Sequence, residues 1–139
     1  MPPADVDVVK RLYEAIESRD AEAVERLLED DVEWIVPSTL PWGGRRRGFE
    51  DVAAGTAILR ETVHSARFER DEYIDVGDGE VLVLGRLSGE GALTGESFEA
   101  EYAHHIRVSD GRISRFQAYI DTAEILKALA EPPADLRID

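Results

Sequence analysis

The chain has 139 residues and a formal net charge of −14, from 30 acidic and 16 basic side chains. This charge argues against nucleic acids and anionic membranes as partners, because both bind basic surfaces. There is no cysteine, which excludes disulfides and thiolate metal sites. No stretch is apolar and long enough to span a bilayer, and the first residues lack a signal-peptide pattern, so we expect a cytoplasmic protein. The length fits one domain, which we expect to comprise residues 1–139.

The first third of the chain predicts two helices and a strand. Residues 6–18 carry apolar side chains at helical spacing, with Tyr13 among them. Asp20 is suited to cap a second helix, which we expect Asp30 and Asp31 to end. Residues 32–36, which include Trp34, predict a short strand.

A loop and a third helix follow. Residues 37–48 are rich in proline and glycine, which predicts a loop. The run Arg45-Arg46-Arg47 within it is the only basic run, and we expect it to be solvated, because no glycine nest or helix start accompanies it. Residues 49–63 have apolar side chains on one side of a predicted helix.

The second half of the chain predicts antiparallel strands. The alternation in residues 66–76 is irregular and favours a bulged strand. Residues 80–88 predict the next strand, and a glycine-rich connection leads to a final hairpin over residues 98–121. A short helix over residues 123–130 closes the pattern, with Thr122 as its cap.

The final hairpin allows its register to be derived. Residues 98–109 alternate strictly, and Asp110-Gly111 suits a two-residue type I′ turn. Ser109 then pairs with Arg112, and an unbulged ladder places His104 opposite Gln117. On this register one face carries the following residues: Phe98, Tyr102, His104, Ile106, Val108, Ile113, Arg115, Gln117, Tyr119 and Asp121. One extra residue in either strand would reverse the faces beyond it.

The preceding hairpin extends these faces. With its centre near Ala92, Val83 opposes Tyr102 and Val81 opposes His104, so both valines join the inner face. The outer face receives an apolar stripe: Leu82, Leu84, Ala103, Phe116, Ala118 and Ile120. A monomer would leave this stripe in water, so we expect a homodimer through it.

The element order predicts an α+β fold with helices packed on one face of a curved sheet. Such a layer can enclose a conical cavity of the kind that holds small molecules.

The chain resembles the NTF2-like superfamily, specifically SnoaL-like domains, which include polyketide cyclase-like and ketosteroid isomerase-like proteins. The resemblance covers residues 8–129 and rests on four segments: Val8-Val9-Lys10-Arg11-Leu12-Tyr13-Glu14-Ala15-Ile16, Asp20 with residues 27–34, Gly48-Phe49-Glu50, and residues 110–121. It implies a cone in which a curved, mostly antiparallel sheet wraps around the N-terminal helices and encloses a pocket. It implies a small hydrophobic ligand and no cofactor.

The resemblance distinguishes among the superfamily's activities. The oxyanion tyrosine of ketosteroid isomerase falls on Leu12, its general base on Val36 and its second acid near His104, so true ketosteroid isomerase activity is not expected. Limonene epoxide hydrolase chemistry is disfavoured too, because no second inward aspartate accompanies Asp121. SnoaL-type cyclases keep an acid/base aspartate late in the last strand and a histidine on the neighbouring strand. Asp121 and His104 are similar to that pair, which makes them the candidate catalytic residues.

Each candidate has a structural alternative. Asp121 also fits the N-cap of the last helix, and His104 also fits a hydrogen-bonded core histidine. The derived register separates the two by roughly 13 Å, so they could act only from opposite ends of a ligand. The expected substrate-binding residues are Tyr13, Trp34, Tyr102, Arg115, Gln117 and Tyr119. No metal site is expected, because His64, His104 and His105 lack a ligand spacing.

Two functions follow from these residues. The first is a cofactor-independent acid/base enzyme of isomerase, cyclase, dehydratase or hydrolase type, acting on a small hydrophobic compound. The second is a non-catalytic ligand-binding or structural NTF2-like dimer.

Overall fold

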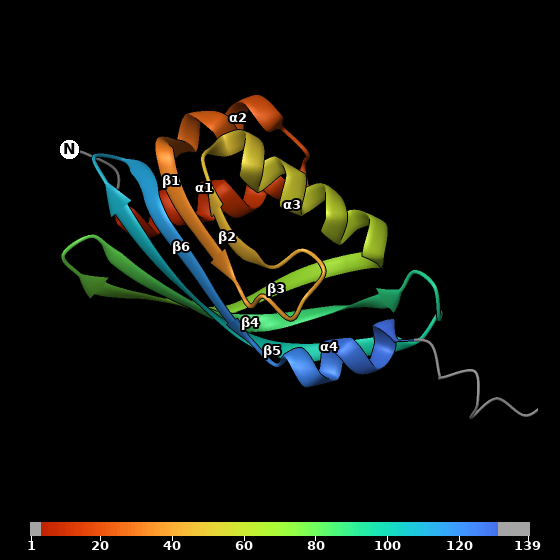
Figure 1. Ribbon diagram of the computed structural model, residues 1–139. Helices are drawn as coiled ribbons and strands as arrows, with labels where there is room; N and C mark the ends of the chain where they lie inside the picture. The colour runs from red at the N-terminus through yellow and green to blue at the C-terminus, as the bar shows by residue number, and fades with distance from the viewer. Residues whose placement is uncertain (1–3, 131–139) are drawn as a thin grey trace, which may run out of the picture.

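The computed structural model describes residues 4–130, which form four helices and six strands (Figure 1). The helices are α1 (Asp5–Glu17), α2 (Ala21–Leu27), α3 (Phe49–Thr62) and α4 (Thr122–Leu129). The strands are β1 (Leu28–Val36), β2 (Gly44–Arg47), β3 (Val63–Gly77), β4 (Glu80–Gly91), β5 (Ser97–Ser109) and β6 (Arg112–Ile120). Within residues 4–130, no helix is long and apolar enough to cross a membrane.

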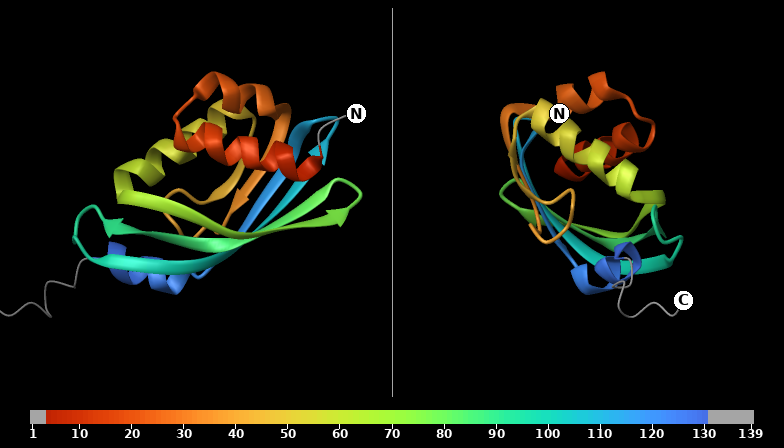
Figure 2. Two further views of the ribbon diagram at one scale, coloured as in Figure 1. Left: turned by 180° about the vertical axis from the view of Figure 1, so that it is seen from behind. Right: turned by 45° about the vertical axis from the view of Figure 1, so that its right-hand side comes forward.

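The strands form one curved sheet in the order β2-β1-β6-β5-β4-β3. The β1–β6 pair is parallel and every other neighbouring pair is antiparallel. Helices α1, α2 and α3 lie on the concave face, and α4 packs against β5 and β4 away from them (Figure 2). The predicted α+β class with an open, mostly antiparallel cone is therefore confirmed.

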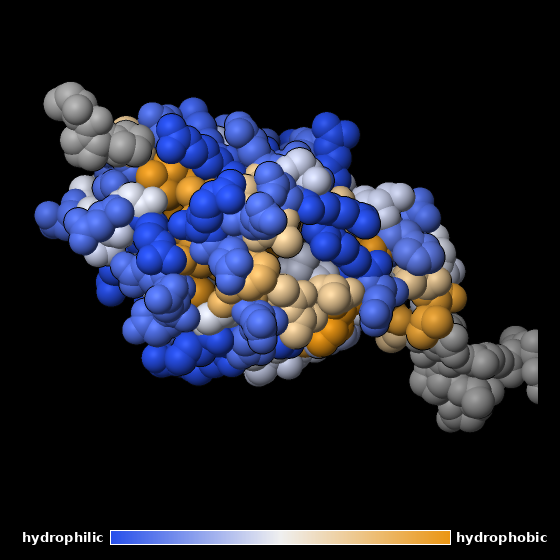
Figure 3. Space-filling view, turned by 90° about the horizontal axis from the view of Figure 1, so that it is seen from above, coloured by the Kyte–Doolittle hydropathy of each residue, from blue (hydrophilic) through white to orange (hydrophobic). Residues whose placement is uncertain are grey.

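The helices form for the reasons that their sequences predict. Val8, Val9 and Leu12 of α1 are fully buried against the sheet, which follows from their helical spacing. The side chain of Asp20 accepts a hydrogen bond from the Ala23 N–H at 3.1 Å, which confirms the predicted cap of α2. Hydrophilic side chains cover most of the helical side of the molecule, with smaller apolar areas between them (Figure 3).

Two predictions about residues 28–48 are wrong. Helix α2 ends at Leu27 and strand β1 begins at Leu28. Asp30 and Asp31 are therefore exposed residues within the strand and do not end the helix. The arginine run is also not a loop: it belongs to β2, which pairs with β1 at the edge of the sheet. Alternation along this short strand turns Arg46 inward between two outward arginines.

A bulge in β6 reverses the faces predicted for the last strand. Ser109 pairs with Arg112 and Val108 with Ile113 as expected, but Arg107 then pairs with Arg115. Ser114 is the extra residue, and its hydroxyl donates a hydrogen bond to the Arg107 carbonyl at 3.2 Å. His104 consequently pairs with Ala118 instead of Gln117.

Beyond the bulge, the residues of β6 lie on the opposite faces from those predicted. The residues predicted inside, Arg115, Gln117 and Tyr119, face outward, and Tyr119 is 55% exposed. Three members of the predicted outer stripe face the concave side instead: Phe116, Ala118 and Ile120. The other three, Leu82, Leu84 and Ala103, stay on the outer face.

The predicted register of the preceding hairpin is wrong by two residues, since Val83 pairs with His104 and Val81 with Ile106. A shift of two keeps every side chain on its face. Val81 and Val83 are accordingly fully buried in the core, as predicted.

Candidate functional site

A pocket of about 90 Å³ lies between the concave face of the sheet and the helices α1 and α3. Its walls are mainly apolar, and the loop between β1 and β2 contributes Leu40 and Trp42. Of the predicted ligand-binding residues, Tyr13 and Trp34 line it, as does the predicted catalytic His104. Its apolar lining suits a flat or alicyclic ring, and a ligand of more than one ring would extend out of this small volume.

One wall of the pocket is an aromatic stack. The rings of Trp34 on β1 and Phe116 on β6 lie parallel, with centroids 3.9 Å apart and an interplanar angle of 8°. The two residues are paired in register across the parallel strands, which explains the stack. The stacked rings give this side of the pocket an apolar, aromatic wall.

The principal polar feature of the pocket is a hydrogen bond between His104 and Tyr13. The Tyr13 Oη lies 2.6 Å from the His104 Nδ1, and both side chains are buried. Burial lowers the pKa of His104 to about 3, because desolvation disfavours the charged imidazolium. His104 is therefore neutral at physiological pH.

The surroundings of Tyr13 keep its hydroxyl protonated. Burial, followed by the nearby Tyr102 and Tyr73 hydroxyls, raises the pKa of Tyr13 well above its ordinary value. The Arg70 guanidinium lies over the Tyr13 ring, 4.9 Å from its centroid, and acts in the opposite direction. Desolvation is the larger effect, so the phenol remains a hydrogen-bond donor.

These protonation states determine the tautomer of His104. Within the described residues, the Tyr13 hydroxyl has no hydrogen-bond partner other than His104 Nδ1. If Nδ1 carried the proton, the hydroxyl proton of Tyr13 would have no acceptor in a buried site, which is costly. Tyr13 therefore donates to Nδ1, and the imidazole proton resides on Nε2. His104, which lines the apolar pocket, thus carries a neutral N–H donor.

The structure does not bring the other predicted site residues to the pocket. Asp121 lies at the N-cap of α4, where its carboxylate accepts a hydrogen bond from the Glu124 N–H at 3.4 Å, as the capping alternative predicts. Arg115 donates to Glu33 at 3.0 Å on the outer side. Tyr102 is buried and stacks on the His104 ring, and its hydroxyl donates to the Glu69 carbonyl at 2.8 Å.

Several pocket residues were not predicted from the sequence. Trp42 lies in the proline- and glycine-rich loop, and Thr56 lies on α3 with its hydroxyl bonded to the Val52 carbonyl. Arg46 is the charged residue of the lining. It donates to the Asp51 carboxylate at 3.1 Å, and its Nε is buried with no hydrogen-bond partner among residues 4–130. In a strand over residues 44–47, side chains alternate between the two faces, which would turn Arg46 away from Arg45 and Arg47; this alternation is the signal that could have found Arg46.

The described pocket lining contains no carboxylate. Its polar side chains are the neutral His104–Tyr13 pair, the two tryptophans, the Thr56 hydroxyl and the Asp51-bonded Arg46, and the remaining side chains are apolar. This set can bind a ring and donate hydrogen bonds to an oxygen atom.

Comparison with known proteins agrees with this fold. The model of a SnoaL-like domain family matches residues 9–116. The chain belongs to this SnoaL-like family. Within it, the chain is 28% identical over 134 residues to the aklanonic acid methyl ester cyclase DnrD of Streptomyces peucetius, covering 91% of both proteins.

Solved structures show the same cone. An NTF2-like protein from Burkholderia thailandensis is 28% identical, with a TM-score of 0.86 over 93% of this chain and 99% of that chain. An NTF2-like protein from Burkholderia xenovorans is also 28% identical, with a TM-score of 0.83 over 91% of this chain and 95% of that chain. Membership of the SnoaL-like family supports a small-molecule role of cyclase or isomerase type.

Proposed function

We propose that this SnoaL-like protein is a cofactor-independent enzyme of cyclase or isomerase type that acts on a small, largely apolar carbonyl compound. The observation that carries the proposal is the hydrogen bond between Tyr13 and Nδ1 of the buried, neutral His104. Because Nδ1 accepts this bond, the imidazole proton lies on Nε2. The ligand ring would lie on the Trp34–Phe116 stack and its carbonyl oxygen would accept from Nε2. Similarity to a curated cyclase supports this reaction class.

The proposed chemistry is stabilisation of negative charge on the ligand oxygen. When the C–H bond beside the carbonyl breaks, its electron pair moves into the new C=C bond and charge develops on the oxygen. A fixed donor in an apolar site stabilises such charge strongly, because little solvent reorganisation is needed. Since no carboxylate lines the described pocket, water takes up the proton in this scheme.

Deuterium exchange into 2-tetralone tests this proposal without knowledge of the natural substrate. We expect the protein to accelerate exchange at C1 in D2O, observed by proton NMR, and His104→Phe to lose at least about tenfold of the acceleration. His105→Phe is the matched control, because His105 is the next residue on β5 and bonds Glu80 on the outer side. Equal rates for His104→Phe and His105→Phe would contradict the assignment. Tyr13→Phe, which removes only the hydroxyl, gives a second test if His104→Phe is unstable.

The second candidate function is ligand binding without catalysis. The absence of a carboxylate from the described lining favours it, because the pocket then has no strong base of its own. Binding of 2-tetralone without accelerated exchange would support this candidate over the enzyme.

The catalytic role predicted for Asp121 stays a prediction, and its variants separate that role from capping. Asparagine caps helices about as well as aspartate, so as a cap Asp121→Asn should change neither the exchange rate nor the melting temperature. Asp121→Ala should cost about 1 kcal/mol of stability at an unchanged exchange rate. Loss of exchange in a fully stable Asp121→Asn would show instead that the carboxylate acts on the substrate.

We further propose a homodimer through the outer face of the sheet. Leu84 and Tyr119 are large side chains that are 37% and 55% exposed there, and Leu82 and Ala103 lie on the same face. A second copy would remove this apolar surface from water. Sedimentation at micromolar concentration should give a dimer that Leu84→Glu converts to a monomer, and a monomeric parent protein would refute the proposal.

A further inference from the structure

A second hollow, which we call the entry groove, adjoins the ligand pocket. It has a volume of about 890 Å³ and lies between the end of α1, the last turns of α3 and the first part of β3. Ile16, Thr56, Leu59 and Phe68 line both the groove and the pocket. A ligand too large for the pocket would therefore extend into the groove.

The entry groove reverses the charge balance of the chain. The whole sequence has nearly twice as many acidic as basic side chains. The groove instead is lined by four arginines and three carboxylates: Arg19, Arg60, Arg67 and Arg70, with Glu17, Glu69 and Asp71. All three carboxylates have arginine partners, because Glu17 pairs with Arg70, Glu69 with Arg67 and Arg86, and Asp71 with Arg86.

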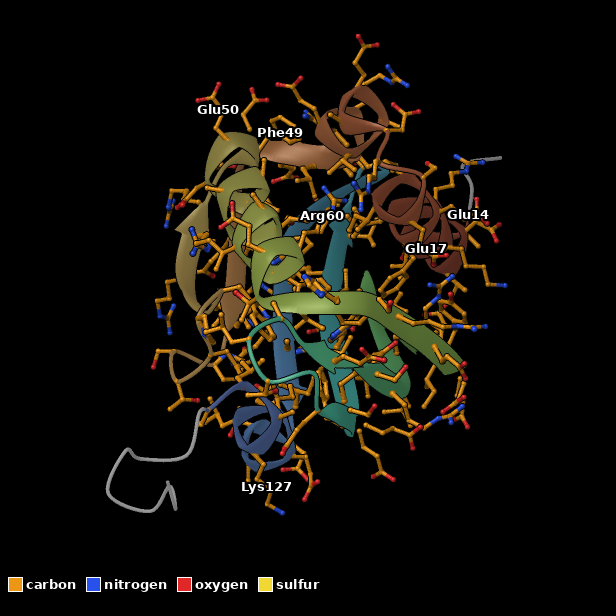
Figure 4. All side chains as sticks on the ribbon, turned by 90° about the vertical axis from the view of Figure 1, so that its right-hand side faces the viewer. Glu14, Glu17, Phe49, Glu50, Arg60 and Lys127 are labelled. Carbon is orange, nitrogen blue, oxygen red and sulfur yellow. The ribbon has the colours of Figure 1, made fainter. Side chains whose placement is uncertain are left out.

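Arg19 and Arg60 are the arginines of the groove without a carboxylate partner within residues 4–130. Arg60 extends from α3 towards the end of α1, where Glu17 also lies (Figure 4), and donates to the Ile16 carbonyl at 3.3 Å. Burial lowers the pKa of Arg60, and repulsion from the like charge of Arg19 lowers it further. An anion placed between them would relieve this repulsion.

The position of Arg60 connects the groove to the pocket. Leu59 and Ile16 line both the groove and the pocket. Arg60 directly follows Leu59 in the chain, and Arg19 lies three residues after Ile16. A group held by the two arginines would thus lie at the open end of a ligand whose ring occupies the pocket.

We propose that the ligand carries a carboxylate, which Arg19 and Arg60 bind in the entry groove while its apolar ring occupies the pocket. The proposal rests on the proposed function for the pocket end and adds the substrate class, an aromatic or alicyclic carboxylic acid. Arginine suits this task because its planar donors match a carboxylate in bidentate geometry. Opposite charge in a groove also raises the local concentration of an anionic ligand in an otherwise acidic protein.

Two fluorescent probes that differ by one anionic group test the proposal. 8-Anilinonaphthalene-1-sulfonate has the ring system of N-phenyl-1-naphthylamine with an added sulfonate, which stands in for the carboxylate. We expect the anionic dye to bind about tenfold more tightly despite the net charge of −14. Arg19→Gln and Arg60→Gln should each weaken the anionic dye about threefold to tenfold and leave the neutral dye unchanged.

Arg26→Gln is the matched control, since Arg26 is an exposed arginine on α2 that pairs only with Glu22 among the described residues. It should change neither affinity, whereas Arg60→Lys should retain part of the anionic preference. Equal affinities of the two dyes, or an anionic affinity that is insensitive to both Arg19→Gln and Arg60→Gln, would overturn the proposal.

Competition with 2-tetralone separates this proposal from the function of the pocket. Displacement of both dyes supports one ligand that spans pocket and groove. If 2-tetralone displaces only the neutral dye, the arginines bind anions apart from the pocket and the single-ligand proposal is overturned. If it displaces neither dye while the arginine variants weaken the anionic one, the proposed function of the pocket fails and the anion site stands.

Discussion

Between pH 6.5 and pH 4 the free energy of unfolding should fall by about 1 kcal/mol per pH unit because of His104 alone. Burial lowers the pKa of this histidine from its ordinary value of 6.5 to about 3 in the folded protein. Above pH 6.5 the imidazole is neutral in both states, and its contribution to stability is fully present. As the pH falls through 6.5 the unfolded chain binds a proton that the folded protein does not, so stability is lost until the folded imidazole also titrates.

Urea unfolding at a series of pH values measures this effect, with His104→Phe as the comparison. The variant should lack the slope between pH 6.5 and pH 4, whereas His105→Phe should retain it. The lowered pKa of Asp71, caused by its hydrogen bond to Arg86, is common to all three proteins. The lowered pKa of Glu80 cancels only between the parent protein and His104→Phe, because His105→Phe removes the hydrogen bond that chiefly lowers it. Parallel stability curves for the parent protein and His104→Phe would show that His104 is not held neutral by burial.

The second large effect concerns the bulge in β6. Phe116→Ala should lower the free energy of unfolding by about 3–5 kcal/mol, because it removes a buried ring that stacks on Trp34. Tyr119→Ala should cost about 0.5 kcal/mol or less, because the Tyr119 ring is largely exposed. Urea denaturation of the two variants measures the difference.

This pair of variants distinguishes the bulged strand from the regular one. An unbulged ladder predicts the opposite order, with Tyr119 inside and Phe116 outside. A large cost for Tyr119→Ala that does not depend on protein concentration would therefore contradict the register described here. A cost that appears only at high concentration would instead report the proposed dimer face.

The fold could be predicted from the sequence largely because its local signals agree. Helical spacing, the Asp20 cap and the Asp110-Gly111 turn each favour the observed elements. The bulge could not be predicted, because both faces of β6 carry large apolar side chains. Phe116 and Ile120 suit the core as well as Tyr119 does, so alternation alone cannot determine which set faces inward.

The candidate site could be predicted only in part, because the bulge affects some of its expected residues and not others. Tyr13, Trp34 and His104 all reach the pocket. The two-residue register error in the hairpin before His104 leaves its side chain on the predicted face. Arg115, Gln117 and Tyr119 follow the Ser114 bulge, and all three are displaced to the outer face. Arg46 was missed because a four-residue edge strand next to glycine and proline is hard to distinguish from a loop.

The tautomer of His104 tests the central claim most directly. Long-range proton–nitrogen NMR of the histidine side chains, assigned with His104→Phe, reports which ring nitrogen carries the proton. We predict a neutral imidazole protonated at Nε2 from pH 7 down to about pH 4, and loss of this single tautomer in Tyr13→Phe. An imidazolium at pH 6, or a neutral ring protonated at Nδ1, would contradict the account of the pocket as a fixed neutral donor.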